Sequence, residues 1–250
     1  MDGKKLISPE FRLTIKDYVI TSGMQIKCRS SKKSKLDWAK VILESSPEDI
    51  IPLKDNDEAV LELGYDDDFD EIINGYLRRS SEDSWKELII KDDLKKLEEI
   101  TVKGTFLDCE PQDIIRYILT KAGIDRFELD QTRYPKKDRA VIKEMNGLKA
   151  ISEIGALWGI SRPFCFKNKV FKWGITEEQK EVYILEEGET LMSLKKTGVL
   201  WKAEVIAIPW LHHSQEVMIS HKEYTGMVEI EEIEIQSEPS GVKMFIWFRG

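Results

Sequence analysis

Alternating apolar and polar residues in the first hundred positions predict β-strands. Phe11, Leu13 and Ile15 are separated by polar residues, and this period of two is typical of a half-buried strand. The same pattern predicts strands at residues 60–65 and 101–107. Residues 85–97 fit either a strand or a turn of helix, so both interpretations stay open.

In the middle of the chain the apolar spacing lengthens to three or four residues, which predicts two helices. The first begins at Pro111, a residue suited to a first helical turn, and ends at Gly123. The second begins after Asn146, a favourable N-cap, and ends at Gly159. Two short amphipathic helices cannot form a domain alone, so we expect them to pack on the flanking strands.

The strand period returns after the second helix and continues to the end of the chain. A tight hairpin is predicted at residues 164–173, and further strands at 182–185, 191–194, 200–208 and 216–219. Val228 and Ile230 share one parity, whereas Ile233 and Ile235 share the other. One extra residue at Glu231–Glu232 explains this slip, so the pattern predicts a β-bulge there.

The closing strand, residues 242–248, is apolar on both of its faces. Such a strand is either central in a sheet or covered by another subunit. Phe245 and Trp247 are therefore candidate subunit-interface residues, and the alternative is that they pack on this chain's own helices. The order of elements predicts an α+β fold, with two β-barrel-like domains at 1–107 and 163–250 flanking a small two-helix insert at 108–162.

Composition limits the class of protein. The chain has 250 residues, 34% of them charged, and a net charge of −8. This length supports an ordinary core, and the acidic balance argues against nucleic-acid binding through a basic field. No apolar run approaches the ~18 residues of a membrane span, and no secretory signal is predicted. Cys28, Cys109 and Cys165 are far apart, so we expect reduced thiols of a protein folded in a cytosol.

No catalytic, metal or cofactor site is predicted. His212 and His213 are adjacent and would point to opposite faces of a strand, so surface or packing roles are favoured for them and for His221. The acidic run at residues 66–71 lacks the spacing of an EF-hand loop and is interpreted as a solvated turn. No nucleophile elbow, phosphate-binding loop or dinucleotide fingerprint is present.

One segment favours a different class of function. Residues 187–194 are similar to the opening of a LysM peptidoglycan-binding module. Residues 199–206, where that module continues into a helix, alternate like a strand. A peptidoglycan-binding module is therefore kept as an alternative, and so is a cell-wall hydrolase, because paired carboxylates cannot be judged by counting acids.

Three segments carry a resemblance to a known family. Residues 111–124 (PQDIIRYILTKAGI), residues 148–159 (LKAISEIGALWG) and the hairpin that ends at residue 174 resemble the phage late control D family, the baseplate hub proteins of contractile tails. Residues 209–219 resemble the turn before a barrel strand of that family, with Ser214 where glycine is common. The resemblance covers residues 10–250.

The resemblance implies a structural role. Hub proteins of this family have two similar β-barrels joined by a small helical part, and three chains close into a pseudo-sixfold ring between the tail tube and the trimeric spike. It therefore implies a homotrimer that binds a tube protein and a spike protein, with no enzymatic activity, cofactor, membrane or specific nucleic-acid partner. The expected location is a phage tail or a tail-like bacteriocin particle, assembled in the bacterial cytoplasm.

Overall fold

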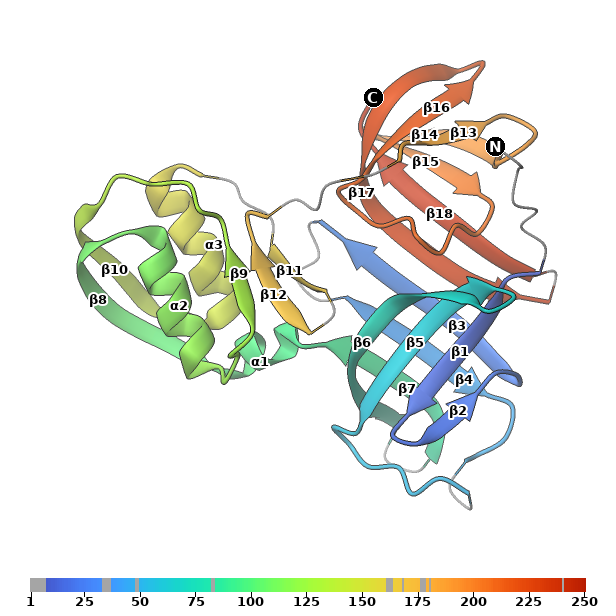
Figure 1. Ribbon diagram of the computed structural model, residues 1–250, viewed down its shortest axis with the longest axis horizontal. Coiled ribbons are helices and arrows are strands. Elements are labelled where there is room, and N and C mark those ends of the chain that lie inside the picture. Colours follow the sequence, from blue (N-terminus) through green and yellow to red (C-terminus); the bar gives the residue numbers. More distant parts are fainter. Residues whose placement is uncertain are drawn as a thin grey trace. The chain divides into compact units, whose positions relative to one another are not determined.

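The computed structural model describes residues 8–32, 37–47, 50–81, 84–160, 164–167, 169–175, 179, 181–239 and 241–250 (Figure 1). The chain divides into two compact units. We name the first the β body, Met1–Asp92 together with Glu178–Gly250, and the second the insert, Asp93–Glu177. The described residues are mostly in antiparallel strands, with three short helices, all in the insert.

The β body is built from strands of both ends of the chain. The N-terminal strands are β1 (Glu10–Ile15), β2 (Tyr18–Ile20), β3 (Met24–Ser31), β4 (Trp38–Leu43), β5 (Glu58–Tyr65), β6 (Asp68–Ser81) and β7 (Ser84–Asp92). The C-terminal strands are β13 (Tyr183–Glu186), β14 (Leu191–Thr197), β15 (Leu200–Val205), β16 (Glu216–His221), β17 (Tyr224–Glu238) and β18 (Gly241–Phe248). Together they form a 13-stranded sheet in the order β14-β15-β18-β17-β3-β4-β7-β6-β5-β1-β2, with β16 and then β13 branching from β17.

Strand β17 joins the two sets of strands. Its first part pairs with β16, and its second part lies between β18 and β3. The buried apolar side chains of both sets form one cluster, which includes Leu13, Leu61, Ile90, Val217 and Phe248. The two ends of the chain therefore share a sheet and a core.

The predicted bulge in β17 is confirmed. Ile230 pairs with Phe248 and Glu232 pairs with Trp247, so Glu231 is the extra residue. All four apolar residues on both sides of it are buried, namely Val228, Ile230, Ile233 and Ile235. The bulge lets one long strand keep its apolar side chains in the core although their parity changes.

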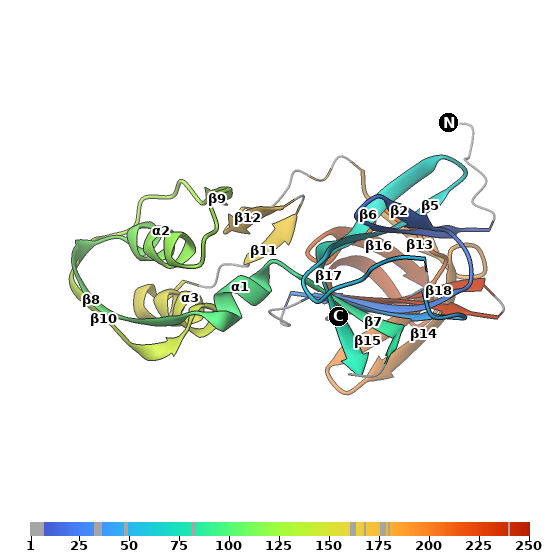
Figure 2. The same cartoon turned by 90° about the horizontal axis from the view of Figure 1, so that it is seen from below.

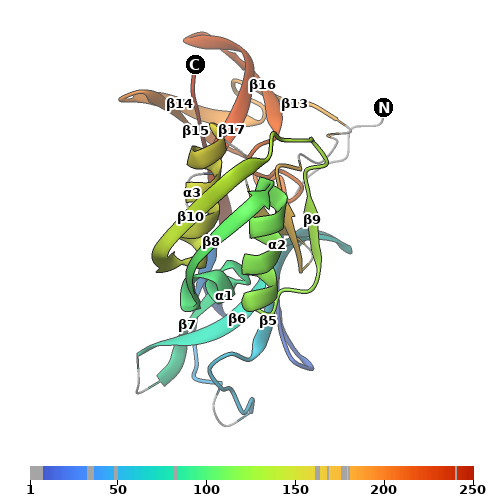
Figure 3. The ribbon, with the colours of Figure 1, turned by 90° about the vertical axis from the view of Figure 1, so that its left-hand side faces the viewer.

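The insert places its helices between two sheets (Figure 2). Its elements are α1 (Leu94–Glu99), β8 (Thr101–Cys109), α2 (Pro111–Lys121), β9 (Phe127–Leu129), β10 (Lys137–Asn146), α3 (Gly147–Trp158), β11 (Phe164–Lys167) and β12 (Val170–Trp173). Strands β8 and β10 form a ribbon on one side of α2 and α3 (Figure 3). Strands β11, β12 and β9 form a small sheet on the other side (Figure 1). Ile118, Ile142, Ile151 and Phe171 are at most 1% exposed in this core.

Both predicted helices are confirmed, and so are their ends. Pro111 occupies the first turn of α2, and a capping box joins Glu110 and Asp113. The side chain of Asn146 accepts a hydrogen bond of 2.9 Å from the Lys149 amide. Gly159 ends α3 with a φ of +66°, a conformation that glycine adopts at little cost.

The insert is larger than the sequence predicts. The expected boundary between residues 107 and 108 falls inside β8, because β8 pairs with β10, a strand that the sequence pattern did not indicate. The hairpin β11–β12 also belongs to the insert, and the expected boundary between residues 162 and 163 lies outside the described residues. Strand pairing in the described residues shows one continuous sheet, so two separate barrels stay a prediction.

Other predicted strands lie where the sequence placed them. The ambiguous residues 85–97 contain both alternatives, the end of β7 and the start of α1. Residues 200–205, which a LysM module would place in a helix, form strand β15. Among the described residues, no helix has the length and hydropathy needed to cross a membrane.

Candidate assembly surface

Phe245 and Trp247 lie on the face of the sheet opposite the core. Their neighbours in β18, Met244, Ile246 and Phe248, are fully buried, whereas these two rings are half-buried. Strand β18 is an internal strand between β15 and β17. The sheet thus covers the backbone edges of β18, and only the side chains on its outer face remain open to a partner.

A lysine covers part of both rings. The Lys202 ammonium lies 4.0 Å from the centre of the Phe245 ring and 4.9 Å from the centre of the Trp247 ring. The two ring centres are 6.4 Å apart. Cation–π contacts at such sites are worth about 0.5–1 kcal/mol each, so Lys202 stabilises the pair without burying it.

Ion pairs bridge β17 and β3 on the same face of the sheet. The Glu232 carboxylate accepts a hydrogen bond of 2.7 Å from the Arg29 guanidinium, and the Glu234 carboxylate lies 3.2 Å from the Lys27 ammonium. The hydrogen bond to Glu232 raises the pKa of Arg29. These cross-strand pairs contribute to joining the N-terminal and C-terminal strands.

A second open face lies on β13, β16 and β17. Register places Ile184, Met218 and Met227 in one row across the three strands. Ile184 is 61% exposed and Met227 is 50% exposed. We name this the acidic–apolar face, and it comprises Val182, Ile184, Glu186, Glu216, Met218, Met227 and Glu229.

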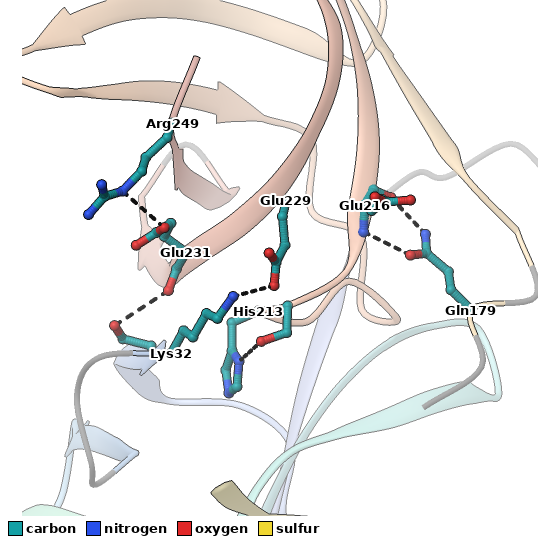
Figure 4. Close-up of polar contacts among 9 residues, drawn as sticks. Lys32, Gln179, His213, Glu216, Glu229, Glu231 and Arg249 are labelled. Atoms are coloured by element: carbon teal, nitrogen blue, oxygen red, sulfur yellow. Dashed lines mark hydrogen bonds and ion pairs between the residues drawn. The ribbon is translucent and has the colours of Figure 1, made fainter. Parts of the chain in front are cut away.

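Carboxylates border that apolar row. Figure 4 shows two of them, Glu216 and Glu229, with their polar contacts. Glu216 and Glu229 are direct cross-strand partners. The Lys32 ammonium lies 2.5 Å from the Glu229 carboxylate. The Gln179 amide group is bonded to the backbone N–H and C=O of Glu216, at 2.8 and 2.7 Å, so it holds the strand edge and leaves the Glu216 carboxylate exposed.

The outer side of the β8–β10 ribbon in the insert is also open. Leu107 is 70% exposed and Val141 is 44% exposed, whereas Val102, Ala140 and Ile142 point to the helices and are buried. We name the open side the basic–apolar face, and it comprises Lys103, Leu107, Arg139, Val141 and Lys143. It carries cations and apolar side chains on one surface.

The two units differ in charge. The insert has 16 basic and 13 acidic residues, a net charge of +3. The β body has 22 basic and 33 acidic residues, a net charge of −11. The overall acidity of the chain therefore comes from the β body alone.

The histidines contact different partners. His212 Nε2 lies 3.0 Å from Asp70 Oδ2, and His213 Nδ1 lies 3.0 Å from Ser214 Oγ. His221 Nε2 lies 3.4 Å from a Glu187 carboxylate oxygen. Within the described ranges, no three His, Cys, Asp or Glu residues converge in a way that could hold a metal ion.

One carboxyl group of the β body is strongly perturbed. Burial raises the pKa of Asp37 to about 6, although hydrogen bonds from Ser30 Oγ (2.7 Å) and the Ser31 amide (3.2 Å) and the charge of His212 lower it. Asp37 precedes β4 and bonds to the end of β3. Its bonding pattern indicates a role in joining strands.

The thiols of Cys28 and Cys109 are free and buried. Burial raises the pKa of Cys28 to about 12, and its Sγ donates a hydrogen bond of 3.5 Å to the Ile235 carbonyl. A thiol with so high a pKa stays protonated at neutral pH and is a poor nucleophile.

A shallow hollow of about 410 Å³ lies on the insert. It is lined by Arg116, Phe127, Glu128, Leu129, Asp130, Gln131 and Ile175. Asp130 accepts hydrogen bonds from Thr132 and Tyr134, which hold the adjoining loop. These contacts support a structural interpretation of the hollow.

Comparison with solved structures defines the fold. The chain is similar to the 43 kDa tail protein of prophage MuSo2 from Shewanella oneidensis, with a TM-score of 0.75, 12% identity, and coverage of 96% of this chain and 97% of that one. It is similar to the tail protein from Neisseria meningitidis MC58, with a TM-score of 0.73, 8% identity, and coverage of 98% and 97%.

A third similar structure comes from a secretion system. The E. coli c3393 protein is a component of the type VI secretion system and resembles the T4 bacteriophage tail proteins gp27 and gp5; the TM-score is 0.66, with 12% identity and coverage of 95% and 76%. No family model and no curated protein matches the sequence. The chain has the fold of these phage tail proteins.

The sequence pattern predicted one of these surfaces, the aromatic pair on β18. It selected Phe245 and Trp247 from the apolar character of both faces of β18, and the structure adds Lys202 as their neighbour. It did not find the acidic–apolar face, because Ile184, Met218 and Met227 are isolated in sequence and become a row only through strand register.

Proposed function

We propose that this chain is a non-enzymatic hub subunit of a contractile phage tail or a related bacteriocin particle, which adapts the sixfold tail tube to the threefold spike as a homotrimer. The observation that carries the proposal is the fold, which a prophage tail protein and a second bacterial tail protein share over 96% and 98% of this chain. The relative described as similar to gp27 and gp5 supports the hub position within the tail.

The open sheet supports a ring. Its ordered path begins at β14 and ends at β2, two unlike strands. Lys195 and Lys196 are exposed on β14, and Val19 is 56% exposed on β2. A chain with two different ends favours head-to-tail contacts between copies, and such contacts close into a ring when the rotation allows it.

Phe245 and Trp247 are the proposed subunit contact on the outer sheet face. Aromatic residues that stay partly exposed in a monomer are frequent anchors of protein interfaces. Burial of these rings, with Lys202 already placed over them, would add apolar contact at little cost in side-chain freedom.

Cryo-electron microscopy of tail particles tests the proposal. We expect three copies of this chain in a ring between the last tube hexamer and the spike. Density for this chain as a single copy, or outside the tube–spike junction, would contradict it.

A cell-wall assay separates the rival functions. Purified protein should neither clear a peptidoglycan suspension nor sediment with insoluble cell wall. Clearing that a single carboxylate substitution abolishes would favour a tail-tip hydrolase, and sedimentation without clearing would favour a binding module.

A further inference from the structure

We propose that the basic–apolar face of the insert docks on the acidic–apolar face of the β body of a second copy of this chain. The neighbouring copy comes from the proposed ring, on which this inference rests. The two open faces supply the contact independently of Phe245 and Trp247.

The acidic–apolar face has the features of an uncovered contact. Its central row, Ile184, Met218 and Met227, runs across three adjacent strands, so its apolar surface is continuous. Methionine side chains adapt their shape to a partner. A continuous apolar row on the solvent side of a sheet marks an interaction site more often than scattered apolar residues do.

The carboxylates around this row favour a positively charged partner. Glu216 and Glu229 face each other across β16 and β17, and like charges in that position destabilise a sheet. Lys32 compensates Glu229. Among the described residues no cation forms an ion pair with Glu216 or Glu186, so these two carboxylates are available to a cation from outside.

The basic–apolar face offers those cations. The Lys103 ammonium lies 3.5 Å from the Glu144 carboxylate, which is a long ion pair. The two side chains are 72% and 67% exposed. Within the described part of the chain no carboxylate pairs with Arg139 or Lys143. Val141 lies between Arg139 and Lys143 along β10, and Leu107 is the cross-strand partner of Arg139 on the same side of the ribbon.

The two faces are complementary in type and in sign. Each is the outer side of a few paired strands, with exposed apolar residues beside charged ones. Sheets pack face to face at about 10 Å. The apolar residues would supply most of the affinity, and the opposite charges would set orientation and association rate. The net charges of +3 and −11 on the two units add long-range attraction.

A second copy is the occupant that fits these faces. Every copy carries one face of each kind, so the contact is heterologous and can pass from copy to copy. The exposed apolar residues on both faces favour a protein surface over a nucleic-acid backbone for the basic face.

Charge reversal in the full-length chain tests the contact. Self-association is measured by sedimentation velocity over a concentration series, at low and high salt. Arg139→Glu with Lys143→Glu should raise the dissociation constant at least about tenfold, and Glu186→Lys with Glu216→Lys should do the same. The four substitutions together should restore association to within about threefold of the unsubstituted chain. Higher salt should weaken the original contact.

A matched control has the same charge change elsewhere on the insert. Lys121→Glu with Lys149→Glu alters exposed residues of α2 and α3, away from the ribbon face. This variant should associate like the original chain. Circular dichroism on all variants verifies that the fold is retained.

Several outcomes would overturn the inference. The ribbon reversal could behave like the control, or the fourfold variant could fail to recover. If the fourfold variant recovered the behaviour of the original chain without a change in sedimenting mass, the contact would lie within one chain. If the original chain stayed monomeric with and without the spike protein, a second copy would be excluded as the partner. If the charge-reversed variants still form a full trimer on the spike protein, this inference fails and the proposed function stands. If neither the original chain nor any variant forms a ring with the spike protein, the proposed function fails as well.

Discussion

In the β body, residues from opposite ends of the chain are neighbours, whereas the insert folds from one continuous segment. Arg29 and Glu232 are 203 residues apart in sequence and form an ion pair. In the insert, every paired strand and packed helix lies within Asp93–Glu177. The β body must therefore close a long loop before its core forms, and the insert needs only local contacts.

This contrast has a structural consequence. The two units have separate cores, so they can unfold separately, and the N-terminal and C-terminal strands must unfold together because they share one apolar cluster. Changes to the chain that affect one unit more than the other test this difference.

Deletion of Glu231 should damage the β body most. Without the extra residue, either Val228 and Ile230 or Ile233 and Ile235 must turn outward, because a one-residue slip exchanges the faces of a strand. Exposing two core side chains costs at least about 3–6 kcal/mol of unfolding free energy. Urea denaturation followed by tryptophan fluorescence measures the loss.

The substitution Glu231→Ala is the matched control for that deletion. It removes the ion pair with Arg249 but keeps the residue count of the bulge. It should cost far less than the deletion. Equal destabilisation by both variants would show that the bulge does not set the strand facing.

A cavity in one unit should leave the other unit folded. Phe248→Ala removes a fully buried ring of the β body and should cost about 3–5 kcal/mol, and Ile118→Ala in α2 should cost about 2–5 kcal/mol. Hydrogen exchange read by mass spectrometry should show loss of protection in β1–β7 and β13–β18 for the first variant. The second should lose protection only within residues 93–177.

Loss of protection over the whole chain in either variant would contradict separate unfolding. Loss confined to the C-terminal strands in Phe248→Ala would contradict the shared core. Both outcomes appear in the same peptide maps.

The pH dependence of stability should reside in the β body. The folded pKa of Asp37, about 6, is higher than the ordinary aspartate value of 3.8, so the folded state binds more protons than the unfolded state between these pH values. Stability contributed by this group is therefore highest below about pH 4 and falls as pH rises through 6. Asp37→Asn should stabilise the chain at pH 7.5 relative to the original by about 2 kcal/mol, and the difference should vanish near pH 4.

Calorimetric scans of both proteins at several pH values measure this difference. The β body transition should move and the insert transition should not. An offset between the two proteins that is constant with pH would exclude Asp37 as the titrating group.

Breaking one ion pair in each unit should give the smallest difference in unfolding free energy between the two units. Glu232→Gln breaks the pair with Arg29, in which the Glu232 side chain is only 18% exposed, and should cost about 0.5–1 kcal/mol. Glu144→Gln breaks the exposed pair with Lys103 in the insert and should change stability by less than about 0.5 kcal/mol. Chemical denaturation of the two variants in parallel compares them, and a larger loss for Glu144→Gln would reverse the expected order.

Sequence patterns predicted the features that depend on nearby residues. The caps at Asn146 and Gly159, the start of α2 at Pro111 and the bulge at Glu231 were all readable, because each depends on backbone geometry or side-chain parity within a few positions. The apolar character of both faces of β18 indicated a strand that is either central in a sheet or covered by another subunit, and its pairing with β15 and β17 shows that it is internal.

Strand partners required the folded chain. The residues around β8 in sequence do not indicate that β8 pairs with β10 in the insert and not with the N-terminal strands of the β body. The residues around β3 likewise do not indicate that β3 lies beside β17. The row of Ile184, Met218 and Met227 and the open side of the ribbon follow from the same pairing. Short-range geometry is encoded by neighbouring residues, whereas register and surface exposure arise from contacts between distant residues, where many pairings satisfy the same alternation until the whole core is packed.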